Sequence, residues 1–346
     1  MKQLLIDAIY ITGGGGTTLL AYLLEKLSQN AQKVTCLIDN RIADKFPNLY
    51  NHLFINLPNS ESERKKFYKA NADKYSIILC FSNVPPPLKL EIPVFTFFQN
   101  KLLLTDSFKA GFRVALGFWI KRIYIFINKK NSDLWIVQTN HMKQGLNKKL
   151  LINNRKILTL PFFPGGEDKK LEKGNNKKNN SFFYITSDTK YKNNYLLVKT
   201  WIDLYNGGFR DIQLILTLKK DYYTKLVKSF KNLPPNITNL EYLPYNHVEN
   251  LYSENKYLIF ASLVESFGLP LIEAYQHSCD IIAPDLPYVN EIIIPTYSFD
   301  PYNSKSLYDI IIKTQKIEDV TGHDTKLLVE DKVDDLIKLL MFPSFE

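Results

Sequence analysis

Glu265-Ser-Phe-Gly-Leu-Pro-Leu-Ile-Glu273-Ala274 is the stretch of this chain that says most about its fold. Seven residues lie between its two carboxylates, the first of which is ahead of a predicted helix and the second within it. Pro270 suits the first position of a helix, where a missing N–H costs nothing. Gly268 lets the backbone approach a ligand closely. The stretch therefore predicts a loop that passes into a helix with an open N-terminus.

The open helix N-terminus and the two acids together predict the chemistry of a ligand. Free N–H groups and the positive end of the helix dipole suit a pyrophosphate. A carboxylate does not bind phosphate, but as an acceptor it can take two hydroxyl donors. An anion with polyols on both sides describes a sugar nucleotide, so we expect this stretch to bind one.

Short apolar, β-branched runs alternate with helical segments throughout the chain, a pattern typical of a parallel α/β architecture. Ligands of such folds bind in a crevice beyond the carboxyl ends of the strands. The predicted strands are 4–11, 33–38, 75–81, 94–98, 134–139 and 156–160, then 182–186, 212–218, 240–243, 257–261, 281–283 and 297–300.

A polar, turn-rich stretch, residues 165–180, separates the two sets of strands and is typical of a linker or surface loop. We therefore predict an N-terminal domain of residues 1–164 and a C-terminal domain of residues 165–324. A last helix is predicted over 325–341. In two-lobed folds such a helix often packs back on the first lobe, and we expect this of residues 325–346.

Size and composition fit two globular domains. The chain has 346 residues, of which 45% are hydrophobic and 23% charged. Its three cysteines lie in or beside apolar runs, which indicates a reducing compartment without disulfides. Asp7 interrupts the first apolar run, where a signal peptide needs an unbroken core. No apolar run approaches the length of a membrane span. We expect a cytoplasmic protein.

The net charge of +9 is concentrated in one place. Residues 109–130 contain six basic residues and no acid, mixed with aromatic and aliphatic side chains. This mixture is typical of a surface that rests on an anionic membrane. It fits equally a core helix with a solvated basic face, because the bases scatter on a helical wheel. A peripheral location on the inner face of the plasma membrane is therefore one of two open interpretations.

Two further motifs lie beside predicted strands. Gly13-Gly14-Gly15-Gly16 follows the first strand and can bring backbone N–H groups against an anion, or can serve only as a tight turn. Lys190-Tyr-Lys192 follows the strand at 182–186, where a lysine can neutralise a diphosphate or stay solvated. No Asp-x-Asp metal motif occurs, so we expect no metal ion and no cofactor. The basic residues form no nucleic-acid motif.

With these motifs in view, the chain resembles the retaining GT-B-fold glycosyltransferases of glycosyltransferase family 4, of the kind that builds bacterial surface polysaccharides. The resemblance is firmest over 182–310 and weaker at Gly13–Gly16 and Val137-Gln-Thr139. Its most specific parts, in the family's order, are Lys192-Asn193, Tyr-Leu-Pro (242–244), Phe260-Ala-Ser-Leu-Val-Glu-Ser-Phe-Gly-Leu-Pro-Leu-Ile-Glu-Ala274, Ile281-Ile-Ala-Pro-Asp285, Glu291 and Phe299-Asp300-Pro301.

The resemblance implies a GT-B fold, in which two Rossmann-like α/β/α domains face each other across a cleft. The N-terminal domain would hold a saccharide acceptor, lipid-linked on this interpretation, and the C-terminal domain a nucleoside-diphosphate sugar. The implied reaction moves a hexosyl group to an acceptor hydroxyl with retention of anomeric configuration and without a metal. It would serve the assembly of lipopolysaccharide or capsule.

The resemblance also implies roles for individual residues. Glu265 and Lys192 would be catalytic, the glutamate on the donor sugar and the lysine on the leaving diphosphate, while Glu273 would bind the ribose. The other implied positions are Ser266, Phe267, Gly268, Leu269, Lys190, Gly15 and Gly16 for the donor, and Gln99 and Asn100 for the acceptor.

Two departures from the family pattern keep other functions open. An arginine common in the family is missing from Thr186-Ser187-Asp188, and Gln99 stands where many members have a histidine. Glutamine cannot act as a general base, but in a front-face retaining reaction the leaving phosphate can take the proton. The alternatives are a noncatalytic sugar-nucleotide-binding subunit of a polysaccharide assembly complex and a GT-B-fold sugar-nucleotide epimerase.

Overall fold

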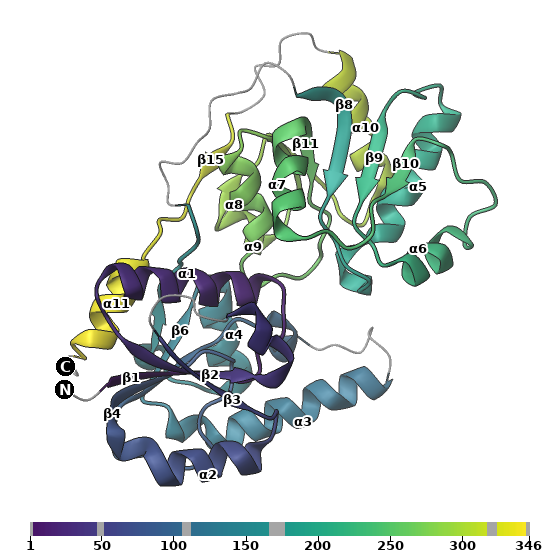
Figure 1. Ribbon diagram of the computed structural model, residues 1–346. Coiled ribbons are helices and arrows are strands. Elements are labelled where there is room, and N and C mark those ends of the chain that lie inside the picture. Colours follow the sequence, from purple (N-terminus) through teal and green to yellow (C-terminus); the bar gives the residue numbers. More distant parts are fainter. Residues whose placement is uncertain (1–2, 47–51, 106–111, 166–176, 317–323, 344–346) are drawn as a thin grey trace. The chain divides into compact units, whose positions relative to one another are not determined.

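The computed structural model describes residues 3–46, 52–105, 112–165, 177–316 and 324–343. The chain forms two compact units (Figure 1). Unit 1 comprises Met1–Gly166 and Glu330–Glu346, and unit 2 comprises Glu167–Val329. The expected domain boundary, between residues 164 and 165, lies two residues from the boundary between the units. None of the helices within the described ranges combines the length and the hydropathy needed to cross a bilayer.

Unit 1 is built on a seven-stranded sheet in which every strand pair is parallel, in the order β3-β2-β1-β4-β5-β6-β7. The strands are β1 Gln3–Ala8, β2 Val34–Asp39, β3 Leu53–Leu57, β4 Tyr75–Cys80, β5 Val94–Phe97, β6 Leu134–Val137 and β7 Ile157–Thr159. The helices are α1 Gly15–Gln29, α2 Glu61–Asn71, α3 Phe112–Asn128, α4 Asn140–Leu150 and α11 Val333–Met341.

Unit 2 contains a six-stranded parallel sheet in the order β10-β9-β8-β11-β12-β14, and a separate antiparallel pair, β13 with β15. The strands are β8 Lys178–Tyr184, β9 Gln213–Leu216, β10 Ile237–Asn239, β11 Asn255–Ile259, β12 Asp280–Pro284, β13 Ile293–Ile294, β14 Tyr297–Phe299 and β15 Lys326–Leu327. The helices are α5 Asn194–Asn206, α6 Lys220–Val227, α7 Tyr245–Glu254, α8 Leu269–Gln276, α9 Pro287–Asn290 and α10 Ser304–Lys316.

The parallel α/β architecture and its two Rossmann-like units are as predicted. Three predicted segments were wrong in detail. The strand predicted at 240–243 is β10, which ends at Asn239. The helix predicted from residue 325 begins only at Val333, because residues 326–327 pair with β13. The predicted linker extends too far, since polar and exposed residues 178–180 already belong to β8. Strand β3 was missed because it is a half-exposed edge strand whose apolar run, residues 53–55, is only three residues long.

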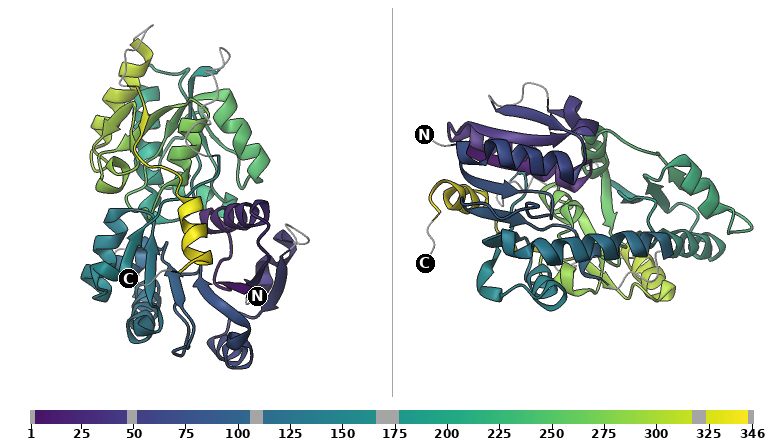
Figure 2. Two further views of the ribbon diagram at one scale, coloured as in Figure 1. Left: turned by 90° about the vertical axis from the view of Figure 1, so that its left-hand side faces the viewer. Right: turned by 90° about the horizontal axis from the view of Figure 1, so that it is seen from below.

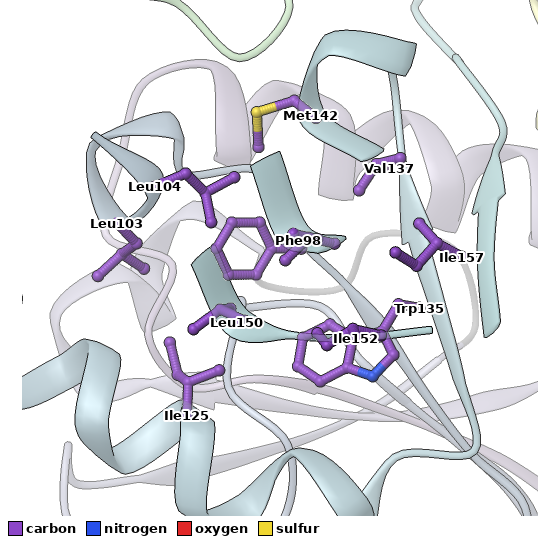
Figure 3. Close-up of a cluster of buried hydrophobic side chains, with 11 residues drawn as sticks. Phe98, Leu103, Leu104, Ile125, Trp135, Val137, Met142, Leu150, Ile152 and Ile157 are labelled. Carbon is purple, nitrogen blue, oxygen red and sulfur yellow. The ribbon is translucent and has the colours of Figure 1, made fainter. Parts of the chain in front are cut away.

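One hydrophobic cluster joins α3 and α4 to the sheet of unit 1 (Figure 3). Trp135 of β6 lies at its centre with Phe98, and Ile125 is the contribution of α3. Burying such side chains is the main favourable contribution to folding. The buried members are Phe98, Leu103, Leu104, Ile125, Trp135, Val137, Met142, Leu146, Leu150, Ile152 and Ile157.

A buried ion pair ties α2 to β1 in unit 1. The Arg64 Nε donates to Asp7 Oδ2 at 2.6 Å, and both side chains are at most 1% exposed. The remaining guanidinium nitrogens donate to the carbonyls of Val84 and Pro85 at 2.7 and 2.8 Å. Tyr68 donates its hydroxyl to the same Asp7 carboxylate. A buried pair needs such complete hydrogen bonding to offset the cost of desolvation.

The C-terminal segment completes unit 1 by packing α11 against α1 (Figures 1 and 2). Val333, Leu336, Ile337 and Leu340 form the buried face of α11. Ahead of the helix, Asp331 accepts hydrogen bonds from the hydroxyl of Tyr22 and from backbone N–H groups. The end of the chain therefore belongs to the same unit as its beginning.

We expect Leu336→Ala to destabilise unit 1 by about 2–5 kcal/mol, the usual cost of removing a buried leucine side chain. Amide hydrogen exchange should show the loss of protection in α1 and β1, while β8 and β11 keep theirs. Lys338→Ala, on the exposed side of the same helix, should change stability by less than about 0.5 kcal/mol. Unchanged protection in α1 would contradict this account of α11.

Candidate active site

The candidate site lies where the strand order of unit 2 reverses. Strands β8 and β11 are neighbours, but the chain continues from β8 toward β9 and β10 on one side, and from β11 toward β12 and β14 on the other. The two loops that follow β8 and β11 therefore diverge, and α/β folds commonly bind their ligands at such a reversal, beyond the carboxyl ends of the strands. The predicted residues Lys190, Lys192 and Glu265 all lie on these two loops.

The loop after β8 is held in a defined conformation. It contains a short 3-10 helix, η7 (Lys190–Lys192), and then Asn193 in the left-handed region with a φ of 57°. The Asn193 side chain donates to the carbonyl of Pro301 at 2.9 Å. The backbone N–H of Leu263, on the loop after β11, donates to the carbonyl of Tyr191 at 2.7 Å. The two loops are thus linked by their backbones.

Lys192 and Glu265 meet at this junction as an ion pair. The Nζ of Lys192 lies 2.6 Å from Oε1 of Glu265, and the two side chains are 15% and 18% exposed. The ammonium also lies 5.7 Å from the ring centre of Phe260, within range of a cation–π interaction. The sequence predicted roles for both residues, but it gave no sign that they touch.

The pair keeps the lysine charged although it is largely buried. Burial on its own would lower the pKa of Lys192, because a desolvated ammonium is unfavourable. The nearby Glu265 carboxylate outweighs that effect and raises the pKa above its ordinary value. The site therefore holds a permanent cation beside a carboxylate, and an arriving ligand can exchange with either partner.

Aromatic side chains for which no role was predicted from the sequence lie close to the pair. Tyr184 ends β8, and its ring is 5.9 Å from that of Phe260, which in turn is 6.4 Å from that of Tyr288. The Tyr288 hydroxyl donates to the carbonyl of Ser262. Burial raises the pKa of both tyrosines, and the charge of Glu265 contributes, so both stay neutral. Their only sequence signal was an aromatic residue at or near the end of a strand.

The predicted helix after Glu265 is present as α8. Gly268 precedes it with a φ of 91°, a conformation that residues with a Cβ rarely adopt, and no side chain caps its N-terminus. Phe267 and Leu269 are buried, at 2% and 9% exposure, so these side chains pack inward. Any contact of theirs with a ligand would come from the backbone. Ser266 is partly exposed.

Glu273 lies one turn inside α8, in contact with an aromatic pair. Its Oε2 accepts a hydrogen bond from the hydroxyl of Tyr252 at 2.6 Å. The Tyr252 ring stacks on His277 with 5.2 Å between ring centres. Burial raises the pKa of Glu273, and the Tyr252 hydrogen bond only partly opposes this shift. Tyr252 and His277 were not predicted, because nothing in their spacing marks them as partners of Glu273.

The predicted residues of unit 1 are brought together in part. Gly15 and Gly16 open α1, with Gly14 as its N-cap at a φ of 63°. A Cβ at Gly16 would lie 3.5 Å from Oε1 of Gln99, so these two positions are neighbours. The Gln99 side-chain amide donates to the carbonyl of Phe81 at 3.0 Å.

The other two predicted positions, Asn100 and Lys190, have different environments. Asn100 uses its side-chain oxygen to cap the 3-10 helix η3 (Lys101–Leu104), at 3.1 Å from the N–H of Leu102. Lys190 is exposed on η7. In the segment that lacks the family's arginine, Thr186 and Ser187 instead bond the side chain of buried Asn194. That segment supplies no second cation to the site.

Part of the sequence is similar to known glycosyltransferases. Residues 167–322 match the sequence profile of the family described as "Glycosyl transferases group 1". The O-antigen chain mannosyltransferase RfbU of Salmonella typhimurium is 25% identical over 224 residues, which are 62% of this chain and 58% of RfbU. The chain thus spans little more than half the length of this relative.

Solved structures share the fold at low sequence identity. Anabaena Alr3699/HepE, crystallised in complex with UDP and glucose, has a TM-score of 0.69 and 12% identity, and the match covers 91% of this chain and 90% of HepE. WaaG, a glycosyltransferase involved in lipopolysaccharide biosynthesis, has a TM-score of 0.65 and 12% identity over 91% and 90% of the two chains. The chain therefore has the GT-B fold of two Rossmann-like units, and its residues 167–322 are similar to the group 1 glycosyltransferases.

Proposed function

We propose that this protein transfers a hexosyl group from a nucleoside-diphosphate sugar to a hydroxyl group of a saccharide acceptor. The observation that carries the proposal is the ion pair of Lys192 with Glu265, at the strand-order reversal of a unit similar to the group 1 glycosyltransferases. The pair provides a cation for a diphosphate and an acceptor for sugar hydroxyls in one place. The uncapped N-terminus of α8, which begins four residues after Glu265, offers further N–H donors.

In the proposed reaction, negative charge builds on the diphosphate as the bond to the anomeric carbon lengthens. Lys192 stabilises that charge, because its ammonium is already in place and is partly shielded from water. Glu265 exchanges its contact with the lysine for the donor's hydroxyl groups and orients the sugar. Glu273 accepts hydrogen bonds from the ribose.

We propose that the configuration of the sugar is retained and that no metal ion takes part. The cation beside the diphosphate is then Lys192, in place of a divalent ion. Gln99, whose amide is held by the carbonyl of Phe81, cannot remove a proton from the acceptor. On the front face of the sugar the leaving phosphate can accept that proton, so a retaining reaction needs no further base.

The acceptor we propose is a lipid-linked saccharide of bacterial surface-polysaccharide assembly, at the cytoplasmic face of the membrane. Support comes from the relatives' names, an O-antigen chain mannosyltransferase and an enzyme of lipopolysaccharide biosynthesis. Gly16 and Gln99 are neighbours in unit 1 and would contribute to this side of the reaction. Asn100, bound to the start of η3, would position the loop.

A second candidate is a noncatalytic sugar-nucleotide-binding subunit. It is favoured by the segment 186–188, which has no arginine to assist Lys192. Donor hydrolysis in the absence of acceptor distinguishes the two candidates, since a binding subunit leaves the donor intact.

We expect Lys192→Ala and Glu265→Ala each to lower kcat by about 10²–10³, the usual cost of removing one group that stabilises transition-state charge. Release of nucleoside diphosphate, measured with a panel of donor sugars, reports the rate. Lys199→Ala is the matched control, because Lys199 is half-exposed and pairs with Asp203 within α5, the helix that follows Lys192. Wild-type rates in both site variants would show that Lys192 and Glu265 are not catalytic, and would leave the description of the fold unchanged.

The raised pKa of Glu273 predicts how nucleotide binding depends on pH. Hydroxyl groups need the ionised carboxylate, so affinity should fall on acidification at a higher pH than for an exposed glutamate. The folding contribution has the opposite sign: it is present at pH values below the ordinary glutamate pKa and is lost as pH rises through the raised one.

Calorimetric titration of nucleoside diphosphates at several pH values measures this dependence. Glu273→Gln should weaken binding by about 10- to 100-fold at neutral pH, as expected for a hydrogen bond to a charged group, and should flatten the acidic limb. Glu254→Gln, at an exposed position in unit 2, should keep both affinity and pH profile. If affinity still falls at low pH in Glu273→Gln, the pH dependence belongs to another titrating group.

A further inference from the structure

Helix α3 presents large apolar side chains to solvent along most of its length. Trp119 is 56% exposed and Ile127 63%. In the view from below, α3 crosses the near side of unit 1 (Figure 2). Single exposed apolar residues are ordinary, but a contiguous set on one element marks a contact surface. The set, called here the α3 apolar face, is Leu116, Trp119, Ile120, Ile123, Phe126 and Ile127.

The α3 apolar face is continuous around the helix. At 100° per residue its six side chains fall within an arc of about 120°, and no charged residue of α3 lies inside that arc. The opposite side of the helix binds unit 1. Ile125 is buried in the hydrophobic cluster (Figure 3). Phe118 packs against that cluster. Arg122 donates to the carbonyls of Leu103 and Thr105 at 2.9 and 2.6 Å.

This arrangement inverts the usual order of a surface helix, which turns its apolar stripe inward and its charges outward. The guanidinium of Arg122 faces the unit, whereas Ile120, Ile123 and Ile127 face solvent. On a helical wheel of α3 the basic residues are scattered. The structure shows which side of the helix is buried, and the exposed side then contains an apolar face without charged residues. Of the basic residues in 109–130, Lys109 lies outside the described residues.

The charges around the α3 apolar face are positive. Lys121 and Lys130 are exposed, and the Lys129 ammonium lies 3.9 Å from the ring centre of Phe126. Residues 112–130 contain no acid. The carboxylate beside this segment, Glu61, accepts hydrogen bonds from Tyr10 and Tyr124 and pairs with Arg64. A partner that contacts α3 thus meets exposed apolar side chains with positive charges near them.

We propose that α3 is the face with which this protein lies on an anionic lipid bilayer. The six apolar side chains enter the boundary between headgroups and acyl chains, with Trp119 at the depth that tryptophan prefers. Lys121 and Lys130 remain among the lipid phosphates, whereas the Lys129 ammonium donates to the carbonyls of Leu150 and Leu151. The helix lies parallel to the membrane plane, since its opposite side is fixed to unit 1 by Ile125 and Arg122.

The same face on a second copy of the chain is a poorer partner. Two α3 helices packed face to face would bring the lysines of both copies together, and residues 112–130 supply no acid to pair with them. Anionic lipid provides a nonpolar phase for the α3 apolar face and negative charge for the lysines. This proposal rests on α3 alone and holds whether or not the transfer reaction is correct.

Sedimentation with lipid vesicles tests the proposal on the full chain. The wild type should bind vesicles of phosphatidylcholine mixed with phosphatidylglycerol, and should bind phosphatidylcholine alone much more weakly. Added salt should weaken binding to the mixed vesicles, because it screens the lysines. Ile120→Asp/Ile127→Asp should lower the partition coefficient by at least about ten-fold, since each buried isoleucine contributes strongly to transfer from water.

Leu53→Asp/Phe342→Asp is the matched control: it makes the same change of charge at two exposed apolar positions of unit 1 away from α3. The control should bind mixed vesicles as the wild type does. Equal loss in both double variants, or no binding of the wild type at low salt, would overturn the proposal. So would a dimer in light scattering that only the α3 variant abolishes, together with no vesicle binding.

Donor hydrolysis without acceptor separates this proposal from the proposed function. The α3 double variant should hydrolyse donor at the wild-type rate, because no residue of the α3 apolar face belongs to the candidate active site. Lost vesicle binding with intact hydrolysis supports the membrane face. If the protein binds vesicles but never hydrolyses or transfers the donor, the proposed transfer reaction is wrong and the proposed membrane-binding face is still supported.

Discussion

The contact between the ammonium of Lys192 and the carboxylate of Glu265 is what makes a charged site possible in unit 2. Each group comes from a different loop, and the loops diverge because the strand order reverses between β8 and β11. Either charge alone, so little exposed, would be costly; together they offset much of that cost. The backbone bond from Leu263 to Tyr191 keeps the loops at one distance. The charges are therefore in position before any ligand arrives, as electrostatic stabilisation requires.

Unit 1 contains an ion pair of similar length with a different use. Arg64 and Asp7 are at most 1% exposed, and the rest of the guanidinium is bound to backbone carbonyls. Lys192 and Glu265 retain 15% and 18% exposure and lie at the open ends of strands. The first pair is closed to ligands and fastens α2 to the sheet, whereas the second can exchange partners. Residual exposure, more than distance, separates a structural ion pair from one available for chemistry.

The sequence predicted the architecture well because local patterns determine it. Buried parallel strands appear as apolar runs, and Gly268-Leu-Pro270 announced the start of α8. Contacts between distant residues were not predictable. Asp7 appeared only as an acid inside an apolar run, since its partner Arg64 lies 57 residues away. Edge strand β3 and the pair of β13 with β15 lacked apolar runs long enough to notice.

The candidate site was foreseen residue by residue, but its internal contacts were not. The sequence pattern singled out Glu265, Glu273 and Lys192, and the resemblance to a family assigned their roles. No role was predicted for Tyr184, Tyr288 or Tyr252. The orientation of α3 was equally hidden, because its amino acids allow two opposite apolar sides. Only the packing of Ile125 determines which of them turns inward.

The path of the chain through the two units has a consequence for how the protein is made. Unit 1 takes its last helix, α11, from residues 333–341, after all of unit 2 has been synthesised. During synthesis on the ribosome, the surface of α1 that packs against α11 thus stays exposed while some 160 residues of unit 2 are synthesised and begin to fold. A nascent chain released early would carry an exposed apolar seam on its first unit, a natural point for a chaperone to bind.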